Sequence, residues 1–467
     1  MKFLSRQKVA LTPLSPIHVG CGEDFEPTNY LIDAEQELLY GFDPSQAILS
    51  EALAKKLAEL GEKGNWLAIQ EFFREHQEHF KPLAHVLIPV AGGVAADYRK
   101  NIGKVANVEA DGRQVINRLS IERHIHSRNT PYIPGSSLKG VLRTAWMDRL
   151  NDKQPVTDKD EKINSTKLAR RLLKGDFATS PLRLLKVGDL MPVGEMDKSI
   201  LYAVNRYKRP KADADKKPRG ITIRKECILP GQYRTLMGEI TIQSLGGKGI
   251  LNSEKRNVPQ QDMHPNLVQI AKDCNAYHLP RLCAELAEMD ETGLVNPDWK
   301  SAIERLLKES TLADRLESGQ AMLVRIGRYS GAENKTLSEV ADIKIMLGKD
   351  ETGRQQHEYR HKTTTYWLSA QTADDQKHML PFGWAILEID LQHDLPELKA
   401  WCESEAQNRP DMKAKYADLA EEKARAKREA ARQRTEREAA EKAQRQAEEA
   451  AAQAAAERAE YLSKLSE

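Results

Sequence analysis

The stretch Pro131-Tyr132-Ile133-Pro134-Gly135-Ser136-Ser137-Leu138-Lys139-Gly140 leads directly into Val141-Leu142-Arg143-Thr144-Ala145 and decides the fold. Its two prolines favour an extended entry, Gly135 permits a turn, and Ser136 or Ser137 is a typical residue for capping the helix that follows. The apolar residues Leu138, Val141, Leu142 and Ala145 recur at helical spacing and form one side of that helix. The pattern predicts a helix from about Ser136 to Leu150.

The beginning of this helix is also a candidate anion-binding site. A first helical turn has free backbone N–H groups and the positive end of the helix dipole. Lys139 and Arg143 stand four residues apart and therefore share one face. The small residues Gly135, Ser136 and Ser137 would let a phosphate reach the backbone, and the two cations would add a salt-dependent attraction. We therefore predict contact with a nucleic-acid backbone here.

Two other interpretations of this stretch were considered: one stays open, and the other is excluded by the order of the residues. A helix after a Pro/Gly loop is also an ordinary structural device, so the pattern alone does not require a ligand. A nucleotide-binding P-loop does not fit, because Lys139 precedes Gly140 instead of following the second glycine.

Overall charge identifies no partner for this chain. Its 467 residues are enough for two domain-sized cores, and 71 Lys and Arg against 69 Asp and Glu leave a net charge of +2. A nucleic-acid surface must therefore come from local clustering of cations. Besides the helix above, the candidate clusters are Arg206–Lys211, Lys216–Arg219 and the arginines Arg118, Arg123 and Arg128.

The cysteines and the N-terminal residues predict a cytoplasmic protein. Five cysteines at irregular spacing do not make a disulfide framework and are typical of a reducing compartment. The segment Met1–Val9 has no long apolar core, and no stretch of the chain reaches the length of a membrane span.

Strand and helix patterns alternate along the chain and predict an α+β fold. Residues 7–43 read as strand, glycine turn and strand in one β-hairpin sheet, in which Val9–Thr12 leads to Ile17–Val19, and Tyr30–Ile32 leads to Leu38–Phe42. Residues 45–80 read as a helical insertion. Further strands are expected within 182–187, 200–204, 221–229, 236–242, 321–326, 363–368 and 384–389, and helices after Asn164 and within 265–316. After Pro410 neither glycine nor proline occurs, which predicts one long solvated helix of roughly 80 Å.

The string Tyr132–Thr144 resembles the signature of the RAMP superfamily, the RNA-binding subunits of CRISPR effector complexes. Leu11–Asp24 resembles the first strand and turn of that superfamily, and Pro27–Asp33 resembles one subfamily, the fifth subunits of Csm-type (type III-A) complexes. The glycine-containing Arg325–Gly331 and the closing Leu380–Trp384 are similar to later parts of the same family.

This resemblance implies two ferredoxin-like (RRM-like) lobes with helical insertions, and the order of the predicted elements suits that architecture. We expect an N-terminal lobe over residues 1–245, a helical segment and second lobe over 246–395, and a charged, Ala-rich helix over 396–467. The implied function is that of a non-catalytic subunit that binds the guide RNA (crRNA), caps the complex at the 3′ side of the crRNA and assists crRNA maturation. The implied partners are crRNA, target RNA nearby, neighbouring RAMP backbone subunits and host nucleases, with no membrane.

RNA recognition needs cations or N–H groups for phosphates, aromatic rings for bases and small residues where backbones approach. Three clusters supply them. The first is the helix start, the second a glycine loop that the resemblance marks as an RNA contact, and the third a polar stretch that an exposed hairpin would explain nearly as well. The predicted contacts are Gly135, Ser136, Ser137, Lys139 and Arg143; then Arg325, Gly327, Arg328, Tyr329, Gly331 and Lys335; and then Arg123 and His124, with His126 and Arg128 close by.

An endoribonuclease that cleaves crRNA precursor or target RNA is the main alternative, and a scaffold whose lobes have lost RNA binding is another. Acid/base cleavage could use His18, His124, His126 or Asp24, although His18 lies in an apolar stretch and is better explained as a core histidine. We expect no metal and no cofactor, because Cys274, His278 and Cys283, with His264 nearby, lack the paired Cys-x-x-Cys spacing of zinc sites.

Overall fold

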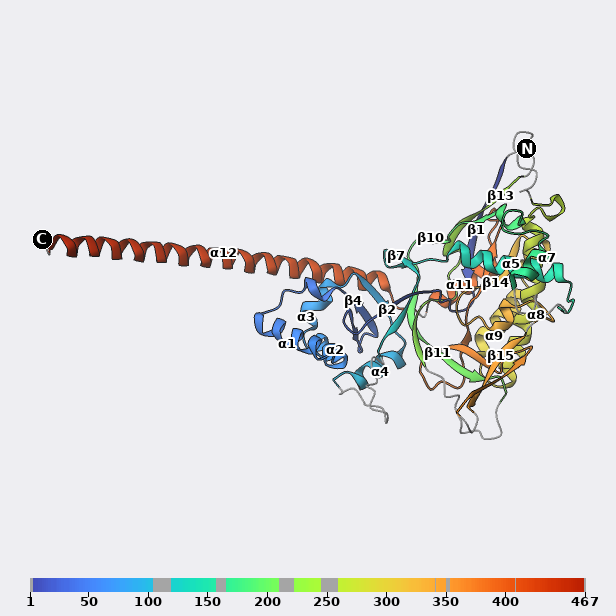
Figure 1. Ribbon diagram of the computed structural model, residues 1–467, viewed down its shortest axis with the longest axis horizontal. Coiled ribbons are helices and arrows are strands. Elements are labelled where there is room, and N and C mark those ends of the chain that lie inside the picture. The colour runs from blue at the N-terminus through green and yellow to red at the C-terminus, as the bar shows by residue number, and fades with distance from the viewer. Residues whose placement is uncertain are drawn as a thin grey trace.

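The computed structural model describes residues 3–103, 119–156, 165–209, 222–244, 259–340, 342–349, 353–407 and 409–465, and it is a mixed α+β fold (Figure 1). Its helices are α1 (Glu51–Glu62), α2 (Trp66–Glu75), α3 (Gln77–Phe80), α4 (Gly92–Asn101), α5 (Gly135–Asn151), α7 (Ser165–Leu172), α8 (Leu267–Glu291), α9 (Pro297–Lys308), α10 (Thr311–Ser318), α11 (Pro396–Ala406) and α12 (Met412–Leu465). The longer strands are β1 (Leu4–Pro13), β2 (Gly20–Phe25), β3 (Tyr30–Asp33), β4 (Leu38–Gly41), β5 (Val86–Pro89), β6 (Ile121–His124), β11 (Lys198–Tyr207), β12 (Ile223–Ile228), β13 (Leu236–Gln243), β14 (Ala321–Arg325), β15 (Ile343–Lys349), β16 (Gln355–Arg360), β17 (Thr365–Ala370) and β19 (Trp384–Glu388). The shorter strands are β7 (His126–Ser127), β8 (Thr130–Pro131), β9 (Leu185–Val187), β10 (Met191–Pro192) and β18 (Leu380–Pro381).

The first large sheet lies between two hydrophobic cores. Its strand order is β10-β13-β1-β19-β14, and β9 pairs with β13. Because side chains alternate along a strand, Met322 and Val324 of β14 join one core, whereas Ala321 and Leu323 join the other. The first of these cores also contains the buried sides of α5 and α7 and the beginning of α8. This packing holds α5 firmly against the sheet.

The second large sheet has the order β18-β17-β11-β12-β6-β2. Its central strand β11 is buried on both faces over most of its length, as a strand enclosed between core layers should be. Both large sheets combine strands from before and after residue 245, since β1 pairs with β19 and β11 pairs with β17. The predicted division at residue 245 therefore does not coincide with a boundary between sheets.

The helical insertion predicted over residues 45–80 is present as α1, α2 and α3. These helices cover one face of a three-stranded sheet of order β3-β4-β5. Phe42, Phe73 and Phe80 fill that interface, with ring centroids 4.6–5.2 Å apart. The opposite face of the sheet packs through Tyr30, Leu39 and other side chains into the main core.

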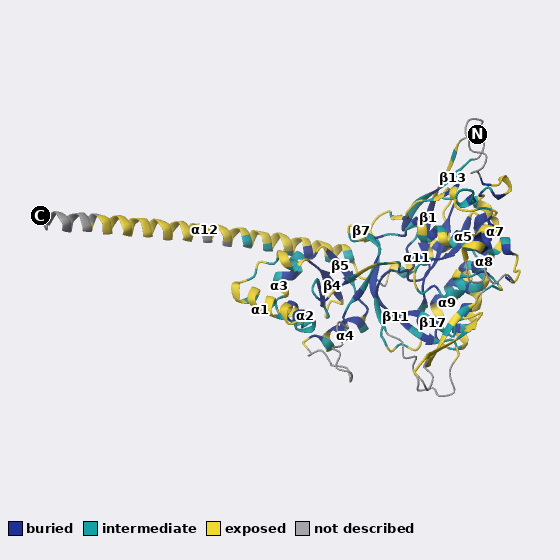
Figure 2. Ribbon diagram, viewed as in Figure 1, coloured by how far each residue is buried: buried dark blue, intermediate teal, exposed yellow. Residues whose placement is uncertain are grey.

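The C-terminal helix α12 extends far from the body of the molecule (Figure 1) and is exposed along most of its length (Figure 2). Near its start, Leu419 is buried in the insertion, and the Tyr416 hydroxyl lies 3.2 Å from the carbonyl oxygen of Leu87. The length of α12 and its exposure beyond this packed start confirm the predicted long solvated helix. Within the residues described, no helix combines the length and the apolar character that crossing a membrane requires.

Several local predictions were wrong. Residues 7–43 do not form one hairpin sheet, because β1, β2 and the β3–β4 pair belong to three different sheets. Ile17–Val19 makes only an isolated bridge, Ile17 to Ile228, and the predicted glycine turn is part of strand β2. Pro181–Arg183 forms a short 3-10 helix, so the predicted strand over 182–187 begins at Leu185.

Among the elements that were not predicted are β5, α4 and the exposed hairpin of β15 and β16, and the helix predicted over 396–467 is divided into α11 and α12. Of the predicted basic clusters, Arg118, Lys216–Arg219 and the end of Arg206–Lys211 lie outside the described residues.

Candidate nucleic-acid interface

A cleft of about 730 Å³ brings the three predicted clusters together. Four segments form its walls: the beginning of β2, the middle of β6, one face of α5 and the loop that follows β14. The residues that line it are Val19, Gly20, Gly22, Glu23, Asp24, Glu122, Arg123, Ser137, Gly140, Val141, Arg143, Thr144, Arg325, Gly327, Arg328, Ser330, Asn334 and Lys335. Segments more than 300 residues apart in sequence therefore meet at one polar hollow.

The N-terminus of α5 differs from the prediction. The helix begins at Gly135, one residue early, so the N-cap is Pro134 and neither serine caps the helix. The Gly135 N–H instead donates to Asp189 Oδ1 at 2.7 Å, so a carboxylate of the protein itself occupies this favourable position at the dipole. Gly135 is buried, and a Cβ there would lie 2.2 Å from the Val187 carbonyl oxygen. Its small size serves packing against β9 and not access for a phosphate.

The side of α5, rather than its end, faces the cleft. Ser137, Gly140 and Thr144 follow one another at spacings of three and four residues and lie on this side, and Ser136 is exposed at the helix start. Nothing lies within 4 Å of the position of a Cβ on Gly140, so the helix backbone is open to a ligand there.

Lys139 and Arg143 do not act as a pair. Arg143 lines the cleft, whereas the Lys139 ammonium donates to the Leu182 carbonyl oxygen at 2.8 Å and is not part of the cleft wall. Burial lowers the pKa of Lys139, and the nearby charge of Lys186 lowers it further. The predicted two-cation face is thus divided between two environments.

The glycine loop after β14 packs closely on the segment that precedes β2. Gly327 has φ 94°, and a Cβ there would lie 2.4 Å from the His18 carbonyl oxygen, so this position requires glycine. The Arg328 N–H donates to the same carbonyl at 2.8 Å. Gly331 also has positive φ, at 77°. These contacts fix the loop at the edge of the cleft.

The aromatic ring and one arginine of this loop already have partners within the protein. The Tyr329 ring lies 4.7 Å from Trp367 and 5.6 Å from Phe382, measured between centroids. Arg325 is 5% exposed and donates to Glu285 Oε1 at 3.0 Å and to the Phe382 carbonyl oxygen at 2.9 Å. Both residues support the loop, and the stacking of a base on Tyr329 would need this aromatic cluster to open.

The third cluster is split by burial. Arg123 lines the cleft, with its guanidinium 4.3 Å from the centroid of Phe25 and donating to Asn129 Oδ1 at 2.9 Å. His124 is fully buried, and burial lowers its pKa to about 4, so it is neutral at pH 7. His124 therefore cannot contact RNA at the surface, and we leave it out of the interface.

Carboxylates in the cleft balance some of its cations. Glu122 Oε2 lies 2.8 Å from the Arg328 guanidinium and also pairs with the buried ammonium of Lys225. Asp24 stands opposite Glu122 in the β2–β6 ladder, and burial together with this carboxylate raises the pKa of Asp24. His18 is fully buried behind them, and burial lowers its pKa to about 3, as expected for a core histidine.

Arg143 and Lys335 are the cleft cations that the protein itself does not neutralise. Across the parts of the chain that the structure describes, no hydrogen bond or ion pair holds either charged group. Burial lowers the pKa of Lys335, and the neighbouring Arg325 and Arg328 lower it further. The two cations line the cleft from different segments, α5 and the short helix that follows the glycine loop, and a phosphate bound there would offset the repulsion that Lys335 meets from Arg325 and Arg328.

Comparison with known proteins identifies the family. The model of the RAMP superfamily matches residues 10–268, more than half of the 467 residues, and the chain belongs to that superfamily. Within it, the chain resembles Csm5 of type III-A CRISPR complexes. The protein named CRISPR system Cms protein Csm5, from Methanocaldococcus jannaschii, is 24% identical over 333 residues, which are 69% of this chain and 71% of that protein.

Two solved structures are also similar. One is a chain in the cryo-EM structure of a Csm-crRNA-target RNA ternary complex of a type III-A CRISPR-Cas system, with 17% identity, a TM-score of 0.48 and coverage of 82% of this chain and 100% of that chain. The other is the crystal structure of T. onnurineus Csm5, with 16% identity, a TM-score of 0.42 and coverage of 81% and 100%.

Sequence reasoning missed several cleft residues. Gly140 and Thr144 could have been found, because they continue the helical face that starts at Ser137. Asn334 and Ser330 lay within a loop that was already predicted. Asp189, which occupies the helix start, lies 54 residues from Gly135, and no local pattern indicates that contact.

Proposed function

We propose that this chain is a guide-RNA-binding subunit of a type III-A CRISPR ribonucleoprotein, and that the cleft between α5 and the glycine loop receives the crRNA backbone. One observation carries the proposal: Arg143 and Lys335 line the same cleft from different segments, and neither has a partner among the described residues. Ser137, Gly140 and Thr144 have small side chains, so the face of α5 that lines the cleft is polar and its backbone is accessible. Close approach by a sugar-phosphate strand requires such a surface.

The finer role in this proposal is the one that the resemblance to the family implies. The chain caps the backbone of the complex at the 3′ side of the crRNA, next to the target RNA and the neighbouring RAMP subunits, and assists crRNA maturation by host nucleases in the cytoplasm. An architecture of two ferredoxin-like lobes, each combining strands from before and after residue 245, belongs to the same proposal.

Salt-dependent binding of a labelled crRNA fragment tests the cleft. We expect the double variant Arg143→Ala, Lys335→Ala to bind roughly 100-fold more weakly, since each of the two contacts of a cation with a phosphate contributes on the order of 1.5 kcal/mol. The slope of log K against log salt should fall by roughly 1.4, because each single-strand phosphate contact accounts for about 0.7.

The double variant Arg305→Ala, Lys308→Ala is the matched control, because it removes one arginine and one lysine that are exposed on α9. We expect its affinity and salt slope to equal those of the wild type. Equal losses in both double variants would mean that net charge, and not the cleft, attracts the RNA.

Incubating the same RNA with the protein and a divalent cation tests for catalysis. We expect the RNA to stay intact. Cleavage that disappears in Asp24→Asn would instead favour the endoribonuclease, because Asp24 is the carboxylate in the cleft that the sequence singled out.

A further inference from the structure

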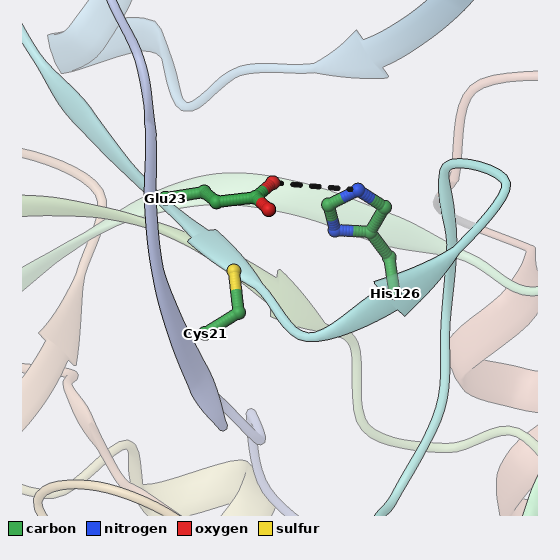
Figure 3. Close-up of side chains that lie close together, drawn as sticks. All are labelled: Cys21, Glu23 and His126. Atoms are coloured by element: carbon green, nitrogen blue, oxygen red, sulfur yellow. Dashed lines mark ion pairs between the residues drawn. The ribbon is translucent and has the colours of Figure 1, made fainter.

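Three side chains of different chemistry converge beside the rim of the cleft: Cys21 and Glu23 from β2 and His126 from β7 (Figure 3). One ligand atom from each, the Cys21 sulfur, a Glu23 carboxylate oxygen and a His126 ring nitrogen, lies within 4.8 Å of the other two. The cluster is the one group of three such donors that meets this distance within the described parts of the chain. It is separate from Cys274, His278 and Cys283, the residues that were considered from the sequence and rejected as a zinc site.

Irregular backbone on both sides creates this convergence. Between the pairs Gly20–His124 and Asp24–Glu122, the β2 strand has more residues than β6, so β2 bulges outward at Cys21–Glu23. On the other side, β7 and β8 form a hairpin whose two turn residues, Arg128 and Asn129, both have positive φ. The bulge and the tight hairpin bring side chains from separate segments to one point.

The hydrogen bonds of the cluster leave three electron-pair donors facing one another. His126 Nδ1 lies 3.0 Å from the His124 carbonyl oxygen, which can only accept, so Nδ1 carries the proton and the neutral ring has a lone pair on Nε2. That Nε2 lies 3.8 Å from Glu23 Oε2, which is also an acceptor. The Cys21 sulfur makes only long contacts to backbone carbonyls, at 3.7 and 3.9 Å. A cation among the three groups would satisfy all of them.

We propose that Cys21, Glu23 and His126 form a zinc-binding site. Zinc prefers sulfur and nitrogen ligands together with a carboxylate, whereas magnesium and calcium prefer oxygen alone. A histidine that ligates metal through one nitrogen commonly donates its other N–H to a backbone carbonyl, as His126 does. On binding, the Cys21 thiol releases its proton to solvent and its sulfur bonds to the metal as thiolate. Water would complete the fourth position.

The site would tie the bulge of β2 to the β7–β8 hairpin. Glu23 is 65% exposed, so its contact with His126 contributes little as an ion pair in water, and its side chain can rotate to close the remaining distance. The guanidinium of Arg123 lies 4.0 Å from the same carboxylate. Because zinc would share the negative charge of Glu23, its binding would leave Arg123 more available at the cleft wall.

Zinc titration of the chelator-treated full-length protein, without RNA, tests this site. We expect one equivalent to bind per chain, and cobalt in its place to show a thiolate-to-metal charge-transfer band. Cys21→Ser should abolish that band. Glu23→Gln and His126→Gln should each weaken binding by at least about 10- to 100-fold, the loss that follows removal of a group that only supports a metal ligand.

Cys283→Ser and His79→Ala are the matched controls. Cys283 is an exposed free thiol and His79 is a partly exposed histidine on α3. Either could bind metal non-specifically, but neither belongs to the proposed site. We expect both to keep the full stoichiometry and the band. Equal loss in the controls, or an unchanged band in Cys21→Ser, would overturn the proposal.

If Cys21→Ser does not fold, Glu23→Gln decides, because its exposed side chain can be replaced without disturbing the core. Wild-type affinity in folded Glu23→Gln would then count against the site. Since no RNA is present, failure here leaves the RNA-binding proposal untouched.

Discussion

Lys139 and Arg143 show at the scale of single residues how identical spacing leads to different roles. Both were predicted to contact phosphate because they share a helix face. The structure directs Lys139 to the Leu182 carbonyl oxygen and leaves Arg143 in the cleft wall. The spacing of two residues along a helix fixes the direction of their side chains to within a fraction of a turn. The neighbouring segment of the protein decides which of the two side chains has a hydrogen-bond partner within the chain.

Single substitutions separate these two cations. We expect Arg143→Ala to reduce the slope of log K against log salt by about 0.7, the value of one single-strand contact, and Lys139→Ala to leave it unchanged. Titration of labelled RNA over a salt series measures both. A larger effect of Lys139→Ala would mean that this lysine leaves Leu182 for the RNA, as the sequence alone suggested.

Two glycines in α5 make a matched pair for a second prediction. Gly140→Ala should raise the free energy of unfolding by about 0.5 to 1 kcal/mol, because alanine is the better helix former and its Cβ meets open space. It should weaken RNA binding, because the Cβ stands in the cleft wall.

Gly135→Ala should instead lower the free energy of unfolding. Its Cβ would collide with the backbone of Val187 and Gly188, and we expect a loss of about 1 to 3 kcal/mol. Denaturant unfolding together with RNA titration measures both variants. Unchanged RNA affinity of Gly140→Ala would show that the strand does not approach this face.

At the scale of elements, the sequence predicted those whose signals are local. The insertion helices, α5 and α12 follow from apolar spacing or from an uninterrupted run of helix formers. Strand β2 was missed because its glycines resemble a turn, although a bulge accommodates them. The hairpin β15–β16 was missed because its side chains are mostly exposed and the polar sequence of β16 shows no apolar alternation.

The long helix α12 divides into a packed beginning and a solvated remainder. We expect removal of residues 426–467 to leave RNA affinity and hydrogen exchange of the body unchanged, because almost all side chains described beyond that point are exposed. Leu419→Ala should destabilise the packing of α12 on the insertion by about 2 kcal/mol, as for a buried leucine.

Hydrogen exchange of the β5 amides, which lie next to the α12 contact at Leu87, measures both changes. Faster exchange in the truncated protein would show that the distal helix folds back onto the body. Unchanged exchange in Leu419→Ala would show that the contact of α12 with the insertion carries no stability.

At the scale of the whole molecule, the α+β class could be predicted, but the way in which the sheets combine the two ends of the chain could not. β1 pairs with both β13 and β19, and these partners lie more than 200 and more than 370 residues away. No periodicity encodes such pairings. The cleft depends on them, because Gly327 reaches the His18 carbonyl only when β14 and β1 belong to one sheet. The candidate residues could therefore be named from sequence, whereas their partners could not.

Glu333 links the glycine loop to the second sheet and makes the whole assembly sensitive to acid. Its carboxylate accepts hydrogen bonds from Lys208 at 2.8 Å and from the N–H and hydroxyl of Thr363 at 2.7 and 2.6 Å. Burial acts to raise the pKa of Glu333, but the charge of Lys208 and these hydrogen bonds outweigh it and lower the pKa to about 2.

Because this pKa is lower in the folded than in the unfolded chain, the stabilisation is complete above about pH 5 and is lost as the pH falls towards about 2. A decrease from 4.5 to about 2 corresponds to roughly 3 kcal/mol at neutral pH. We expect Glu333→Gln to unfold more easily than the wild type in urea at neutral pH and to lose less stability on acidification. Glu317→Gln, on the exposed side of α10, should follow the wild type at every pH. Parallel curves for Glu333→Gln and the wild type would mean that other carboxylates govern acid unfolding and that the loop is held without this ion pair.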